Sequence, residues 1–153
     1  PAGTRIKRPS FGARDYTKDL GMEWSLSEHE LASMRAEMVV ASRLGELEPP
    51  VDTVFIHIKE DEAFRVSCEL VRDLGFQGKL CIHPGQISTA NAAFTPTEEQ
   101  LAFAKKVIDA FVEAEAAGSA SIQIDGYFVD YPIVDKAQRI VDIAEAIARA
   151  EAA

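Results

Sequence analysis

The fold is decided by residues 51–85, VDTVFIHIKEDEAFRVSCELVRDLGFQGKLCIHPG. Residues 51–58 form a run rich in β-branched side chains, which is typical of a buried parallel strand. A helix is expected at Asp61–Leu74, with Gly75 ending it, and residues 79–82 form a second short strand. Because the connection is too long for a hairpin, this stretch predicts a right-handed βαβ unit and a parallel sheet.

The residues before this stretch extend the same pattern. Residues 9–16 predict a short strand that runs into a turn, and residues 27–44 predict an amphipathic helix with Ser27 and Glu30 as a capping box. The order is therefore strand–helix–strand–helix–strand, which favours parallel βα units.

The residues after it predict a different arrangement. Thr95 is expected to cap a helix that has Pro96 at its first position and runs to about residue 117. Residues 121–129 have strand or loop character around the turn dipeptide Asp125-Gly126. A last helix is expected from Ile133.

Composition and charge exclude several classes of protein. The formal net charge is −9, which argues against a nucleic-acid partner, and the basic group at residues 5–8 is best explained as a solvated tail. No run approaches the roughly 18 apolar residues of a membrane helix. Cys68 and Cys81 lie inside apolar patterns, so we expect two small buried side chains in a reducing cytoplasm.

Three parallel strands with two helices make a poor domain, because a parallel sheet needs cover on both faces. Closing such a sheet into a barrel takes eight βα units and roughly 250 residues. The sequence therefore predicts part of a larger structure. The missing strands are expected to come from another chain or to have been lost by truncation or proteolysis.

Four segments together resemble one known family: residues 11–21 (FGARDYTKDLG), 51–54 (VDTV), 75–87 (GFQGKLCIHPGQI) and 125–132 (DGYFVDYP). In order and spacing they are similar to the citrate lyase beta-subunit-like proteins of the HpcH/HpaI aldolase superfamily, which includes the malyl-CoA lyases. The resemblance implies an α/β fold in which residues 1–92 supply strands 6–8 of a TIM (β/α)8 barrel. Residues 93–153 would be a C-terminal helical lid extension that packs on a neighbouring subunit.

The resemblance also implies a magnesium-dependent carbon–carbon lyase acting on a short hydroxyacyl-CoA thioester, such as citryl-CoA or malyl-CoA. Asp15 matches the family's aspartate ligand for Mg2+, with Mn2+ as the alternative ion; by spacing alone it would cap a turn. The family's second metal ligand, a glutamate, has no counterpart here, nor do the N-terminal substrate-binding arginines. In the family the backbone at Gly12, Ala13 and Arg14 holds the substrate carboxylate, although many relatives carry glutamate or alanine at position 14.

Further roles follow from the same resemblance. Asp130 matches an aspartate that a neighbouring subunit projects over the active site, where it transfers a proton; without the family it would be an acid at a helix start. Asp52 and the segment Ile82, His83 and Pro84 are placed along the channel for the CoA arm. For His83 a structural or pocket-lining role is favoured over a catalytic one.

Two alternatives remain open at this point. The chain could be a non-catalytic assembly fragment, as the missing glutamate suggests, or a malyl-CoA thioesterase of the same family. As a lyase it is expected to work with the missing N-terminal barrel half in a homotrimer or hexamer. Its expected partner is a small acyl-CoA, and neither a nucleic acid nor a membrane is expected to bind. The expected location is the cytoplasm or, in a eukaryote, the mitochondrial matrix.

Overall fold

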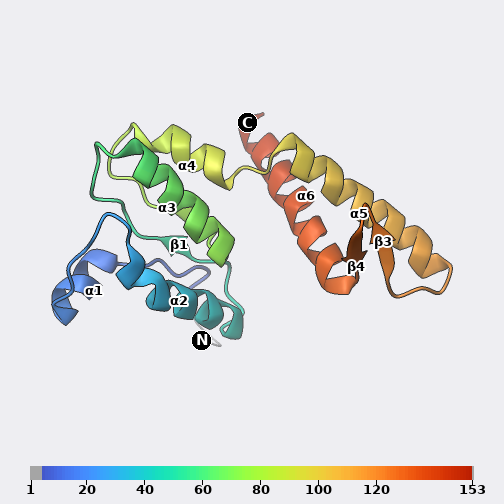
Figure 1. Ribbon diagram of the computed structural model, residues 1–153, viewed down its shortest axis with the longest axis horizontal. Helices are drawn as coiled ribbons and strands as arrows, with labels where there is room; N and C mark the ends of the chain where they lie inside the picture. Colours follow the sequence, from blue (N-terminus) through green and yellow to red (C-terminus); the bar gives the residue numbers. More distant parts are fainter. Residues whose placement is uncertain (1–4, 153) are drawn as a thin grey trace. The chain divides into compact units, whose positions relative to one another are not determined.

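The computed structural model describes residues 5–152, so that residues 1–4 of the expected basic tail and residue 153 lie outside the described part. The chain forms two compact units, the first ending at Phe94 and the second beginning at Thr95. Figure 1 colours the first unit from blue to yellow-green and the second from yellow to red. Each unit is built around its own apolar core.

The first unit is organised by three parallel extended segments. Strand β1 (Val51–Asp52) pairs in parallel with β2 (Gly78–Lys79), and Ser10 forms a parallel bridge to Val51. The predicted parallel pairing is thus confirmed, but the strands are shorter than residues 51–58 and 79–82. The described residues supply no strand beyond Ser10 or β2, so the sheet has no further pairing at either edge.

Helices connect and cover these segments in the first unit (Figure 1). They are α1 (Ala13–Leu20), the 3-10 helix η1 (His29–Leu31), α2 (Ala32–Leu44), α3 (Asp61–Leu74) and α4 (Gln86–Phe94). Helix α3 has the predicted bounds and ends at Gly75, whose φ of 106° is left-handed. It buries Phe64, Cys68 and Val71, and the first two form a core with Phe55, Ala90 and Ala93.

The starts of α1 and α2 differ from the sequence prediction. The short strand predicted at the start of residues 9–16 is present as a bridge from Ser10 to Val51, but the turn predicted after it is the first turn of α1, which begins at Ala13. The predicted capping box is also wrong, since Glu30 accepts hydrogen bonds from the backbone N–H and the hydroxyl of Ser25 at 2.8 and 2.7 Å. The chain turns at Glu28, with φ 53°, and this turn separates Ser27 from the helix.

The second unit is a hairpin between two long helices. It consists of α5 (Glu98–Ala116), β3 (Ile122–Ile124), β4 (Tyr127–Val129) and α6 (Tyr131–Glu151). Asp125 and Gly126 have φ of 50° and 85°, the two left-handed positions of a type I′ turn, so the sequence signal for a turn is confirmed. The core of this unit gathers side chains from all four elements: Ala104, Val107, Phe111, Ile124, Val129 and Ala137.

The cap of α5 is Thr97 and not the predicted Thr95. The Thr97 hydroxyl accepts the N–H of Gln100 at 3.1 Å, and the Gln100 side chain accepts the N–H of Thr97 at 2.9 Å. Thr95 also has an acidic residue, Glu98, three residues after it, but the structure forms the reciprocal capping box at Thr97 with Gln100 as its partner. None of the described helices is long and apolar enough to cross a membrane.

The prediction of two buried cysteines is correct for Cys68 and wrong for Cys81, which is exposed. Cys68 lies in the core on α3, and burial raises the pKa of its thiol to about 12. Cys81 follows β2 on the side where the described residues supply no further strand. Partial burial raises its pKa as well, but its side chain reaches solvent.

We therefore expect one thiol to react with Ellman's reagent in the native protein at about pH 8, and the second only after unfolding, because the buried thiol is neither ionised nor accessible. Absorbance of the released thiolate, with and without denaturant, measures both. The variant Cys81→Ser should show no fast thiol in the native state. Rapid reaction of both thiols without denaturant would contradict the burial of Cys68.

Candidate functional site

The carboxyl ends of the three parallel segments meet at one edge of the first unit. Residues 12–15 follow the Ser10 segment, Thr53 and Phe55 follow β1, and residues 80–84 follow β2. Ligands of parallel α/β sheets bind at this edge, because the loops there converge while the strands stay fixed. The topology thus gathers the predicted residues of the first unit at this edge.

At the first of these ends, the predicted Gly12–Arg14 turn is the first turn of α1. Gly12 is the N-cap and supplies no side-chain cap. The N–H of Ala13 instead donates to the hydroxyl of Thr53 at 3.2 Å, and both residues are buried. The amide of Ala13 is therefore occupied within the protein, so the geometry does not support its predicted contact with a substrate carboxylate.

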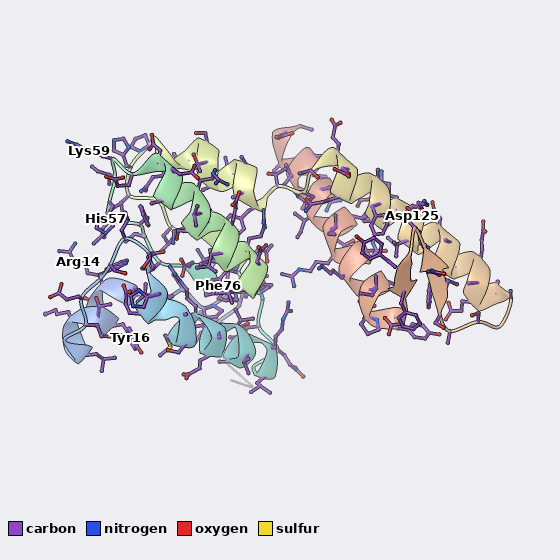
Figure 2. All side chains as sticks on the ribbon, in the orientation of Figure 1. Arg14, Tyr16, His57, Lys59, Phe76 and Asp125 are labelled. Carbon is purple, nitrogen blue, oxygen red and sulfur yellow. The ribbon has the colours of Figure 1, made fainter. Side chains whose placement is uncertain are left out.

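Asp15 and Arg14 lie exposed in the same first turn. Figure 2 labels Arg14 at the start of α1 and His57 in the segment that follows β1. A helix start favours negative charge, which suits Asp15 itself and an anion beside it. Among the described residues no group of three or more His, Cys, Asp or Glu side chains could hold a metal ion. Asp15 is therefore an exposed carboxylate at this edge, and its role as a metal ligand stays a prediction.

Asp52, at the second end, is fully buried in an ion network. Arg35 on α2 binds it through two parallel hydrogen bonds, Nε to Oδ1 at 3.0 Å and Nη2 to Oδ2 at 2.8 Å. Lys79 on β2 donates to the same Oδ2 at 2.5 Å. Its carboxylate is thus committed to the interior and, in this geometry, does not line an open channel. By its place at a strand end Lys79 could be expected to be solvated or to meet a CoA phosphate, but its side chain is buried against Asp52.

Glu28 is the second anion of this network and was not identified from the sequence. It accepts from Nη2 of Arg35 at 2.8 Å, from the hydroxyl of Ser67 and from the indole of Trp24 at 3.3 Å. Two cations and two anions balance, as burial of charge requires. A weak sequence signal existed, since Asp52 and Lys79 both lie within apolar strand patterns.

The charge state of Arg35 is secured by its partners. Burial lowers the pKa of its guanidinium, but the hydrogen bond and charge of Asp52, followed by the charge and hydrogen bond of Glu28, outweigh burial and raise it. One nitrogen, Nη1, is buried without a hydrogen-bond partner among the described residues.

The third end is the exposed segment Ile82, His83 and Pro84. The side chain of Ile82 is 55% exposed, and Nδ1 of His83 accepts the N–H of Gly85 at 3.1 Å. An accepting Nδ1 in a neutral ring leaves the proton on Nε2. This local bond is what a pocket-lining or structural histidine would make. His57, on the segment after β1, packs its ring against Phe55 at 5.6 Å.

Asp130 belongs to the second unit, where it is the N-cap residue of α6 and makes no side-chain cap bond. Its backbone C=O accepts the N–H groups of Ile133 and Val134 at 3.0 Å. Of its apolar neighbours, Val129 is buried, but Phe128 and Tyr131 are 67% and 50% exposed. Within this chain the Asp130 carboxylate therefore has little apolar cover from these neighbours.

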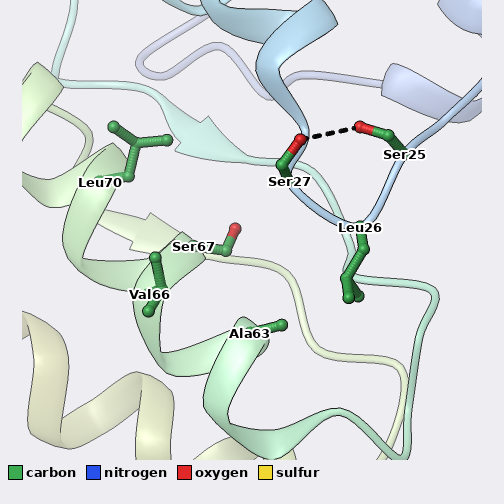
Figure 3. Close-up of a pocket in the computed structure, with 7 residues that line it drawn as sticks. All are labelled: Ser25, Leu26, Ser27, Ala63, Val66, Ser67 and Leu70. Atoms are coloured by element: carbon green, nitrogen blue, oxygen red, sulfur yellow. Dashed lines mark hydrogen bonds between the residues drawn. The ribbon is translucent and has the colours of Figure 1, made fainter.

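A groove of about 490 Å³ lies elsewhere, between the 25–27 loop and α3 (Figure 3). Its walls are mainly apolar, with three serines among the lining residues: Ser25, Leu26, Ser27, Ala63, Val66, Ser67 and Leu70. None of the predicted site residues lines it. The chemistry of the predicted residues therefore points to the strand-end edge and not to this groove.

Comparisons with known proteins identify a family. A family profile described as HpcH/HpaI aldolase/citrate lyase matches residues 3–84. Citrate lyase subunit beta of Haemophilus influenzae is 33% identical over 150 residues, which are 98% of this chain and 51% of that protein. The (3S)-malyl-CoA thioesterase of Cereibacter sphaeroides is 34% identical over 147 residues, which are 96% of this chain and 51% of that protein.

A solved structure shows the same fold. The crystal structure of protein CitE from Mycobacterium tuberculosis, in complex with magnesium, acetoacetate and coenzyme A, matches with a TM-score of 0.74. The match covers 89% of this chain and 51% of that chain at 24% identity. The chain spans about half the length of the relatives it matches.

Removing one partner from the buried network should lower the free energy of unfolding. Asp52→Ala leaves Glu28 as the remaining anion of the network for both Arg35 and Lys79. One buried positive charge is then uncompensated, so we expect a loss of about 3–5 kcal/mol in the free energy of unfolding. Glu48→Ala is the matched control, because its ion pair with Arg8 is exposed and is worth about 1 kcal/mol at most. Denaturant unfolding followed by circular dichroism measures both. Equal losses would show that the network does not stabilise the fold.

Proposed function

The chain belongs to the HpcH/HpaI aldolase/citrate lyase family, and from this membership we propose that it forms part of a magnesium-dependent carbon–carbon lyase. Its substrate is a CoA thioester of a short hydroxy acid, such as citryl-CoA or malyl-CoA. The observation that carries the proposal is the strand-end edge, where Asp15 lies exposed at a helix start in a chain matched along 98% of its length by a citrate lyase subunit.

We propose that the first unit is the last three βα units of a TIM barrel. Its three parallel segments and the match to about half of each relative support this proposal. The second unit would be an extension that packs on a neighbouring subunit of a trimer or hexamer. Tyr127, Phe128 and Tyr131 are at least half exposed around Asp130, and such large apolar side chains favour a covering surface.

In this proposal Asp15 contributes one carboxylate to the Mg2+ site and the other protein ligand comes from outside the chain. A bound Mg2+ would supply Lewis-acid polarisation of a carbonyl oxygen. Gly12 and Arg14, at the start of α1, would hold the substrate carboxylate by the helix-start dipole and the guanidinium charge. Ile82, His83 and Pro84 would line the channel for the CoA arm.

The reaction breaks the bond between the carbon next to the thioester and the carbon that bears the hydroxyl. The bonding electron pair passes to the thioester and forms its enolate. The hydroxyl group releases its proton to solvent, and its carbon becomes a carbonyl carbon. Asp130, supplied by a neighbouring subunit, would protonate the enolate carbon. That role requires the protonated acid, which the apolar cover of a subunit interface favours.

Two alternatives remain. A thioesterase would use the same residues, and the relative at 34% identity named (3S)-malyl-CoA thioesterase favours it specifically. A non-catalytic assembly fragment is favoured because no group of three or more His, Cys, Asp or Glu side chains among the described residues could hold a metal ion.

Asp15→Ala in the full-length protein should abolish Mg2+-dependent turnover. Loss of a Lewis acid worth several kcal/mol in the transition state corresponds to a fall of at least about 1,000-fold in kcat/KM. Asp19→Ala is the matched control, because Asp19 is exposed on the same helix away from its first turn, and it should keep full activity. Unchanged turnover in Asp15→Ala would remove the metal assignment.

Product analysis separates the lyase from the thioesterase. With malyl-CoA and Mg2+, a lyase should release acetyl-CoA and glyoxylate without free thiol. A thioesterase would release malate and free CoA, which a thiol reagent detects directly. Chromatography of the CoA species at early times gives the answer, and free CoA appearing at the rate of substrate loss would replace the lyase proposal.

A further inference from the structure

One buried side chain at the strand-end edge has no role in the function proposed above. Gln86 is the first residue of α4 and is 4% exposed. Its Oε1 accepts the backbone N–H groups of Ile82 at 3.0 Å and of His83 at 3.3 Å. Its Nε2 donates to the backbone C=O of Phe55 at 3.0 Å. One amide group therefore joins the segment after β2 to the segment after β1.

Beyond Leu80, whose N–H donates to the C=O of Asp52 at 3.0 Å, few contacts among the described residues fix the segment after β2. Ile82 is 55% exposed, so burial of its side chain does not anchor the loop. The bonds within the loop, from Gly85 to His83 and from the Gln86 N–H to the His83 C=O at 3.0 Å, shape the turn but do not attach it to its neighbour. Phe55, in contrast, is completely buried, so its carbonyl is a fixed point.

We propose that Gln86 is a positioning residue, which holds the segment Ile82, His83 and Pro84 at a fixed distance from the segment after β1 and thereby sets the affinity for the CoA thioester. The inference rests on the proposed function, because that function places the CoA arm along this segment. Gln86 itself does not touch the reacting atoms. Its effect should therefore fall on KM and not on kcat.

The position requires both an acceptor and a donor, which an amide supplies in one group. A glutamate has the same shape, but as a carboxylate it only accepts, and one oxygen would face the carbonyl of Phe55. As a protonated acid it donates to that carbonyl and restores the bond. When the carboxyl group that Gln86→Glu introduces is protonated, the variant should consequently behave like the wild type. When that group is ionised, the hydrogen bond to the carbonyl of Phe55 should be lost.

Other titrating groups near this position are present in both proteins. They are His83 in the loop, His57 against Phe55, Cys81 and the buried Lys79 beside β2, and Arg72 on α3, which bonds the carbonyl of Ala93 at the far end of α4. Dividing the KM of the variant by the KM of the wild type at each pH removes the contribution of these groups.

The test uses the full-length protein with malyl-CoA as the probe. For Gln86→Glu at about pH 8 we expect KM about tenfold above the wild type with kcat within about twofold, since one lost buried hydrogen bond changes affinity by about this factor. The ratio should shrink toward one as the pH is lowered to about 5.5, because burial favours the neutral acid. Gln77→Glu is the matched control; Gln77 is exposed before β2, and its KM ratio should stay near one.

Three results would overturn the inference: a KM ratio for Gln86→Glu that equals the Gln77→Glu ratio, a KM ratio that does not change with pH, or a fall in kcat with KM unchanged. A second measurement does not depend on substrate. Hydrogen exchange of residues 80–86 should be faster in Gln86→Leu than in the wild type, and equal exchange contradicts the positioning role of Gln86. The two proposals can fail separately. If the wild type neither turns over malyl-CoA nor binds CoA, the proposed function is wrong. Faster exchange in Gln86→Leu would still support the role of Gln86 in holding the loop.

Discussion

The first unit depends on the neutralisation of four charges that have no access to water. Arg35 from α2, Asp52 from β1, Lys79 from β2 and Glu28 from the turn before η1 each have a side-chain exposure of 1% or less. Burial of an unpaired charge is prohibitive, so these elements have to meet in the arrangement that satisfies all four. A shift of β2 along β1 by one residue would turn Lys79 away from Asp52. The network thereby specifies the register of the two strands as well as their contact.

With the strands fixed, two uncharged hydrogen-bonding groups connect their carboxyl ends. Thr53 holds the first amide of α1, and Gln86 holds two amides of the loop after β2. Both groups are buried side chains that bind the backbone of a neighbouring segment, so the loops are located by the interior of the unit. Residues that face outward at this edge, such as Asp15 and Ile82, are then free to serve a ligand. Precise sites on α/β proteins are commonly supported in this way.

The sequence predicted the parts of the fold that depend on local patterns. The bounds of α3, the Asp125-Gly126 turn and the parallel pairing all follow from periodicity and turn chemistry. The capping boxes failed at Ser27 and Thr95, because the choice between neighbouring polar residues depends on where the chain turns. Helix α4, which lies between the short strand β2 and Pro96, was not predicted from the sequence. Among the candidate site residues, Asp15 and Asp130 were proposed from the resemblance alone. The roles of Arg35, Glu28 and Gln86 rest on contacts with residues 17 to 39 positions away in the chain. No local pattern reports such contacts.

The outer side of β2 has a consequence for how this chain behaves in solution. Among the described residues no strand pairs there, and Leu80 and Ile82 beside it are 43% and 55% exposed. An added extended segment would gain ladder hydrogen bonds and cover both side chains in one step. Supplying such a segment as a separate polypeptide should therefore raise solubility and suppress self-association together, as complementation does for split proteins.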